Sequence, residues 1–280
     1  MDSTVIIGRE AQRLGDLLAA ADPDAAVPTC PGWTAAELLA HLTQVHGFWS
    51  EVLASRATTD AQIEAIESSR PELPKDLGAL VEARARATAA LLAQLDARAD
   101  EEEAWSWLPT DQTLGFTRRM QVHEATMHRI DAEMTCGQPV TEPSEEVALA
   151  GIAHCADVMW EADHQWTSMQ STVTPVALLV LRPRGGPEIF IEMSRAEPSD
   201  ADGESFVVAR RARDQDLAPG TALSALPRAE VTGGAVAVDL WCWGRGKALD
   251  RLAGGPQHVD VTGDPDALAA LDALLERGLQ

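Results

Sequence analysis

The chain has 280 residues, enough for about two domains, and its 45% hydrophobic and 24% charged residues are typical of a folded globular protein. Its 44 acidic side chains outnumber the 22 basic ones and give a formal net charge of −22 at pH 7. Nucleic-acid backbones and anionic membranes are bound through clustered lysine and arginine, so neither class of partner is expected. No apolar run approaches the ~20 residues that cross a bilayer.

The first half of the sequence is predicted to be helical, because apolar residues recur at helical spacing. Pro71 and Pro74 indicate a loop or broken connection over residues 55–75. The predicted helices cover about residues 4–20, 34–53, 76–96, 116–136 and 143–166.

The start of the second helix is the most clearly specified. Thr34 and Glu37 have the spacing of a capping box, in which each side chain bonds the other residue's backbone amide. Trp33 and Leu38 occupy the positions of a hydrophobic staple around that cap. The sequence therefore predicts a helix that begins directly after Thr34.

The pattern changes at about Ser171, after which short β-branched segments are bounded by proline, glycine and aspartate. A short helix within 233–244 and a last helix from Asp264 to Arg277 complete this half. The predicted strands are 173–181, 188–193, 205–209 and 258–262. We therefore predict an α+β protein, with a helical bundle over residues 1–170 and a small α/β domain over residues 171–280.

The helix predicted over 116–136 carries Glu124 and His128, which lie one turn apart on one face because they are four residues apart. The sequence is not the metalloprotease motif HExxH, since Met127 stands where that motif needs its second histidine. A carboxylate and an imidazole one turn apart can nevertheless supply two ligands to a divalent metal. A third ligand has to come from another helix.

His41 is the natural third ligand, because its leucine neighbours place it near the core side of the second predicted helix. Helical bundles build metal sites from inward side chains on facing helices. Three protein ligands with one open position is the arrangement of catalytic zinc. Asp131, three residues after His128, lies on a similar face and is a candidate to orient that ligand.

Each of these residues also has a purely structural interpretation. His41 alone would be a hydrogen-bonded core histidine, Glu124 with His128 a surface pair, and Asp131 a solvated or salt-bridged carboxylate. His46, five residues after His41, is predicted to lie on the surface. Cys30 is predicted to pack, although its place before a helix leaves a reactive thiol open.

Three segments together resemble the mycothiol-dependent maleylpyruvate isomerase family of actinobacteria: VPTCPGWTAAELLAHLTQVHGFW, RRMQVHEATMHRIDAE and LWCWGRG. The resemblance implies a DinB-like four-helix bundle followed by an α/β domain. It also implies that His41, Glu124 and His128 bind the metal, which we expect to be zinc, and that mycothiol is the co-substrate.

The chemistry implied by this resemblance is coherent. Only a thiolate attacks an electrophile, and coordination to a divalent cation deprotonates a thiol. Addition to an electron-poor double bond, rotation and expulsion would isomerise it from cis to trans, whereas retention of the sulfur would make an S-transferase. Arg245, in the WGRG segment, is the candidate cation for the negative charge of the substrate.

Two other functional classes remain open from the sequence. One is a thiol-independent metal hydrolase, and the other is a non-catalytic DinB-like module that binds metal, thiol or a partner.

The four cysteines form no CxxC pair and no secretory signal peptide is visible, so we expect a reducing, cytoplasmic location and, by default, a monomer.

Overall fold

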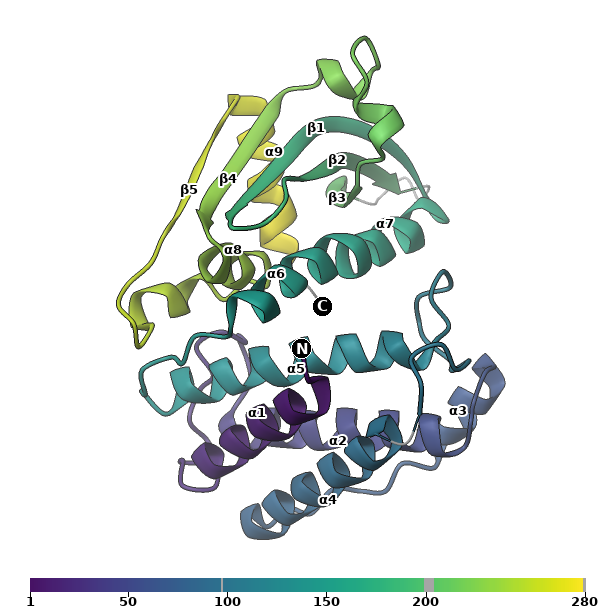
Figure 1. The fold of residues 1–280 in the computed structure, drawn as a ribbon, viewed down its shortest axis with the longest axis vertical. Helices are drawn as coiled ribbons and strands as arrows, with labels where there is room; N and C mark the ends of the chain where they lie inside the picture. The colour runs from purple at the N-terminus through teal and green to yellow at the C-terminus, as the bar shows by residue number, and fades with distance from the viewer. Residues whose placement is uncertain (97, 199–203, 279–280) are drawn as a thin grey trace. The chain divides into compact units, whose positions relative to one another are not determined.

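The computed structural model describes residues 1–96, 98–198 and 204–278, which form two compact units, Met1–Thr141 and Glu142–Gln280 (Figure 1). Within the described residues, no helix has the length and apolar character needed to cross a membrane. The first unit consists of helices α1 (Ser3–Leu18), α2 (Ala35–Ala54), α3 (Asp60–Ser68), α4 (Leu77–Asp96) and α5 (Leu114–Thr135).

The predicted capping box starts α2 as expected. The backbone N–H of Thr34 donates to Glu37 Oε2 at 2.8 Å, and the backbone N–H of Glu37 donates to Thr34 Oγ1 at 3.3 Å. These two bonds satisfy amides that a helix start otherwise leaves without partners. Helix α5 ends at a glycine, since Gly137 follows its C-cap Cys136 and has a φ of +64°.

Helices α1 and α5 run in the same direction, and a buried ionic network joins them. Arg129 Nε donates to Glu10 Oε2 at 2.5 Å, and Arg13 Nε donates to Glu133 Oε1 at 3.3 Å. Residue numbers therefore rise together along both helices. Arg129 Nη1 also donates to Glu133 Oε2 at 2.7 Å.

Helices α2 and α4 also run in the same direction. His46 Nδ1 lies 2.9 Å from Thr88 Oγ1, and Arg98 Nη1 donates to the carbonyl of Leu53 at 2.8 Å. Two neighbouring parallel helices need a connection that returns along their whole length. Residues 55–76 provide that connection and contain α3, a short helix that the sequence did not predict.

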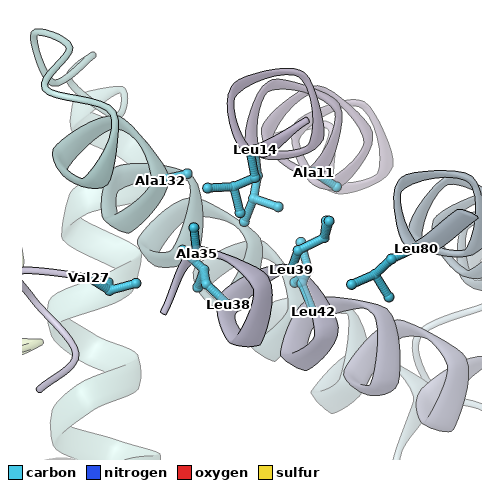
Figure 2. Packing of buried hydrophobic residues seen from close by; sticks show 10 residues of the cluster. Ala11, Leu14, Val27, Ala35, Leu38, Leu39, Leu42, Leu80 and Ala132 are labelled. Carbon is cyan, nitrogen blue, oxygen red and sulfur yellow. The ribbon is translucent and has the colours of Figure 1, made fainter. Parts of the chain in front are cut away.

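The core of the first unit lies between these four long helices and is made of leucine and alanine side chains (Figure 2). It buries residues that the helical periodicity placed on inward faces. The cluster consists of Ala11, Leu14, Leu18, Val27, Ala35, Leu38, Leu39, Leu42, Leu80 and Ala132.

The second unit is a five-stranded sheet with helices. Strand β1 lies at its centre, and its residues 177–181 are all buried, as expected for a strand covered on both faces. The strand order is β3-β2-β1-β4-β5, with β1 and β4 parallel and the other pairs antiparallel. The strands are β1 (Ser171–Arg184), β2 (Ile189–Pro198), β3 (Phe206–Arg211), β4 (Arg228–Gly234) and β5 (Val259–Gly263).

In the described part of this unit the helices are α6, α7, α8 and α9, with a π-helical turn and three short 3-10 helices between elements. Their bounds are α6 (Glu145–His154), η1 (Cys155–Met159, the π turn), α7 (Trp160–Ser168), η2 (Asp214–Leu217), η3 (Leu223–Ala225), α8 (Ala235–Cys242), η4 (Gly246–Arg251) and α9 (Pro265–Arg277).

The division between units differs from the predicted boundary at residue 170. The change from helices to strands does fall at Ser171, but α6 packs on α8 and α7 packs on β3, so both helices belong to the second unit. The π turn divides the helix predicted over 143–166 into two. Strand β4 was not predicted, because its sequence RAEVTGG is short and partly polar.

Candidate metal centre

The structure brings His41, Glu124 and His128 together in the first unit. His41 Nε2 lies 2.8 Å from Glu124 Oε1, and His128 Nε2 lies 3.2 Å from the same oxygen. The candidate ligand atoms of the three residues all lie within 4.8 Å of one another. The helical spacing within α5 and the cap that starts α2 thus place two imidazoles and a carboxylate at one point.

This donor set fits a divalent cation. Ligand atoms around a tetrahedral ion with bonds of about 2.1 Å lie about 3.4 Å apart, so small shifts from the present 2.8 Å and 3.2 Å would fit such an ion. Two imidazoles with one carboxylate is a combination found in catalytic zinc sites. The His41 side chain is 33% exposed and that of Glu124 is 21% exposed, so the centre is open to small molecules.

Asp131 contacts His128, the candidate ligand that we predicted it to orient. Its Oδ2 lies 2.8 Å from His128 Nδ1, and its side chain is fully buried. Because an aspartate only accepts, the proton of that bond belongs to His128 Nδ1. In the neutral imidazole the lone pair is then on Nε2, the nitrogen that faces Glu124 and His41.

The charges around His128 favour its protonated form. Burial opposes charge on His128, but Glu124 and Asp131 outweigh it and raise the pKa of His128 to about 9. Burial likewise opposes the charge of Glu124, yet His128 and His41 hold the pKa of its carboxyl well below the usual range. A cation held by these residues would take the place of a proton.

His46 is not on the surface, contrary to the prediction. Its side chain is fully buried between α2 and α4, and burial lowers its pKa to about 3. Thr88 Oγ1 donates its proton to the carbonyl of Arg84 at 2.9 Å, so it accepts from His46 Nδ1. The sequence suggested otherwise because His46 lies off the leucine stripe of α2, on the face that turns to α4.

Arg245 belongs to the second unit, where it follows α8 and precedes η4. Its Nη1 donates to the carbonyl of Trp243 at 2.7 Å. Its predicted role toward a substrate stays a prediction.

The chain is similar to known proteins in part of its sequence and in its fold. Residues 6–133 match the family model for the mycothiol maleylpyruvate isomerase N-terminal domain. No curated protein matches the sequence significantly. Over 95% of both chains and at 14% identity, the structure is similar to the crystal structure of the mycothiol-dependent maleylpyruvate isomerase, with a TM-score of 0.55.

A histidine-to-alanine mutant of that isomerase gives a TM-score of 0.53 at the same identity and coverage. The segment that matches this family model, residues 6–133, includes all three candidate ligands, and the chain has the fold of the mycothiol-dependent maleylpyruvate isomerase.

Proposed function

We propose that this chain is an enzyme that holds a zinc ion on His41, Glu124 and His128 and uses mycothiol to attack an electrophilic small molecule. The convergence of the three ligand atoms within 4.8 Å of one another carries the proposal. The family match supports the thiol, because the matched segment contains all three residues.

A divalent cation at this centre would make thiolate available at neutral pH, where a free thiol is mostly protonated. The residues of the chain supply the remaining requirements. Glu124 contributes one negative charge, and His41 and His128 contribute neutral nitrogens. Asp131 keeps the proton of His128 on Nδ1, away from the centre. Three protein ligands leave room for a thiol in a fourth position.

The substrate we propose is a small molecule with an electron-poor double bond or another electrophilic carbon. Addition of sulfur followed by its expulsion gives a cis–trans isomerase of the maleylpyruvate type. Addition without expulsion gives a mycothiol S-transferase. Both reactions need the same thiolate, so the centre supports the two equally.

Metal content is the first test of the proposal. Mass spectrometry of the purified protein should find about one zinc ion per chain, and Glu124→Ala and His128→Ala should lose it while keeping their helix content. Glu51→Ala and His258→Ala are the matched controls, since both residues are exposed and neither contributes to the centre. Absence of zinc after reconstitution, or full occupancy in the two variants, would contradict the ligand assignment.

Thiol dependence is the second test. The zinc-loaded protein is incubated with maleylpyruvate, or with a general electrophile such as chlorodinitrobenzene, with and without mycothiol. Turnover that requires mycothiol is expected. An equal rate without thiol would indicate a hydrolase instead, and zinc binding with no turnover of any electrophile would indicate a binding module.

Arg245 is proposed to balance the negative charge of a carboxylate-bearing substrate. Arg245→Gln should raise KM for maleylpyruvate at least tenfold, because a charge-assisted bond contributes about 1.5–3 kcal/mol. Zinc content should stay at the wild-type level. Arg251→Gln, a nearby exposed arginine, is the control. An unchanged KM in the Arg245 variant would remove this residue from the proposal.

A further inference from the structure

The turn before α2 contacts the candidate metal ligands from one side through Trp33. The Trp33 ring centroid lies 4.8 Å from that of His41 and 6.0 Å from that of His128. Its plane is nearly parallel to the His128 ring, at 18°. The sequence pattern gave Trp33 only a place in the helix cap, whereas the structure places its ring against both imidazoles.

The same turn reaches the centre by a second route, through Cys30. The Cys30 thiol donates to Asp131 Oδ2 at 3.4 Å, across 101 residues of chain. That oxygen also accepts from His128 Nδ1 at 2.8 Å. A hydrogen-bonded series therefore runs from the thiol through the carboxylate to the imidazole. The packing role predicted for Cys30 describes only part of its contacts.

The turn has its own internal bonds, which fix Cys30 relative to Trp33. The backbone N–H of Val27 donates to the carbonyl of Trp33 at 2.9 Å, and the backbone N–H of Trp33 donates to the carbonyl of Cys30 at 3.1 Å. Gly32 between them has a φ of +87°, a backbone conformation that side chains strongly disfavour. The bonds and the glycine together hold both side chains at defined places.

We infer that Cys30 and Trp33 are positioning residues that hold the metal ligands in their binding orientation. The inference rests on the proposed metal centre. An imidazole on a helix can rotate about its side-chain bonds, and fixing those bonds on metal binding costs free energy. Trp33 restricts rotation of both rings before the metal arrives, and Cys30 holds the Asp131 oxygen that orients His128. Residues that orient ligands in this way affect metal affinity by about 10–100-fold.

The test is zinc affinity, measured by competition with a chromophoric chelator on the full chain. Trp33→Ala and Cys30→Ala should each weaken zinc binding by about tenfold or more. Trp33→Phe keeps a stacking ring and Cys30→Ser keeps a donor, so both should recover most of the affinity. The visible spectrum of the cobalt-substituted protein should shift in the alanine variants and resemble wild type in the conservative ones.

Trp49 provides the matched control. It is a buried tryptophan of α2, the helix that follows the turn of Trp33, and it packs on Phe48 and Trp105 instead of the imidazoles. Trp49→Ala should lower the thermal midpoint without changing zinc affinity. Wild-type zinc affinity and an unshifted cobalt spectrum in Trp33→Ala and Cys30→Ala would overturn the inference, whatever their thermal midpoints.

A metal-free measurement separates this inference from the proposed function. If wild type binds no metal, the proposed function fails, but the orientation of the rings can still be measured by NMR relaxation of the His41 and His128 ring carbons. Greater ring mobility in Trp33→Ala than in wild type would support the positioning role. Equal mobility in both proteins would overturn it.

Discussion

Helix α5 carries an ion-paired arginine on the side that faces α1 and two candidate metal ligands on the side that faces α2. On the side of α1, Arg129 is buried and lies between the carboxylates of Glu10 and Glu133, so one cation meets two anions of the protein. On the side of α2, His41 and His128 both point a nitrogen at one oxygen of Glu124.

The difference shows that one helix can use polar residues on one side for packing and polar residues on another side for binding. Around Arg129 the protein supplies all the main partners, including the carbonyl of Thr141 at 2.6 Å from its Nη1. Around Glu124 three ligand atoms converge and part of the carboxylate remains exposed. The first arrangement joins two helices, whereas the second is suited to an added cation.

Arg129→Leu should have the largest effect on stability. Removing one partner of a buried ionic group leaves the other charges uncompensated, which costs about 3–5 kcal/mol. Urea unfolding should show this loss, and the folded fraction should still bind zinc. Arg9→Leu is the control: its side chain is 65% exposed and also pairs with Glu10, so we expect a loss of less than about 1 kcal/mol. Similar losses in both variants would contradict the distinction.

Asp131→Asn should have the next largest effect, on the metal side. Asparagine keeps the shape but loses the charge that fixes the His128 proton, so zinc affinity should fall about 10–100-fold. Chelator competition measures the change. Asp272→Asn, on the exposed face of α9, should leave the affinity unchanged. Zinc affinity within error of wild type in Asp131→Asn would show that His128 is oriented by other contacts.

His46→Gln should have the smallest effect, on the pH dependence of stability. Burial lowers the pKa of His46 from 6.5 to about 3 in the folded protein, so only the unfolded chain takes up this proton between those values. The stability therefore falls as pH falls from 6.5, by about 1.4 kcal/mol per pH unit for this one residue. Glutamine can still donate to Thr88 but does not titrate.

Urea unfolding of wild type and His46→Gln between pH 7 and pH 5 tests this expectation. Over this pH range the free energy of unfolding should fall less in the variant than in wild type. The difference should correspond to the uptake of about one proton by the unfolded chain. The wild-type slope also contains His123, whose pKa burial lowers to about 4, so the variant should keep a reduced slope. Parallel curves for the two proteins would show that His46 does not contribute.

Part of the candidate site could be predicted from sequence because some of its determinants are local. Glu124 and His128 share a helix turn, and Thr34 with Glu37 specifies where the helix of His41 begins. The direction of the helices was not predictable, since periodicity indicates an inward face but not the neighbour it meets. For that reason the sequence did not reveal the contact of His46 with Thr88 or that of Cys30 with Asp131.

The second unit shows the same limit. Strand β1 was recognised because its buried run is continuous, whereas β4 pairs with β1 in parallel although its own sequence is weakly strand-like. Parallel pairing to a central strand stabilises β4, and the residues of β1 that provide this pairing lie about 50 residues earlier in the chain. The segment of α6 and α7 was predicted to be helical, but the packing of α7 against the sheet is a tertiary property.

The parallel pairing of α1 with α5 has a consequence for biosynthesis. Glu10 meets Arg129 across 119 residues of chain, so α1 leaves the ribosome long before its partner exists. At about 5–20 residues per second, that interval is roughly 6–24 s. Glu10 has no Arg129 to pair with during this time, so the ionic network that joins α1 to α5 can form only after α5 has emerged.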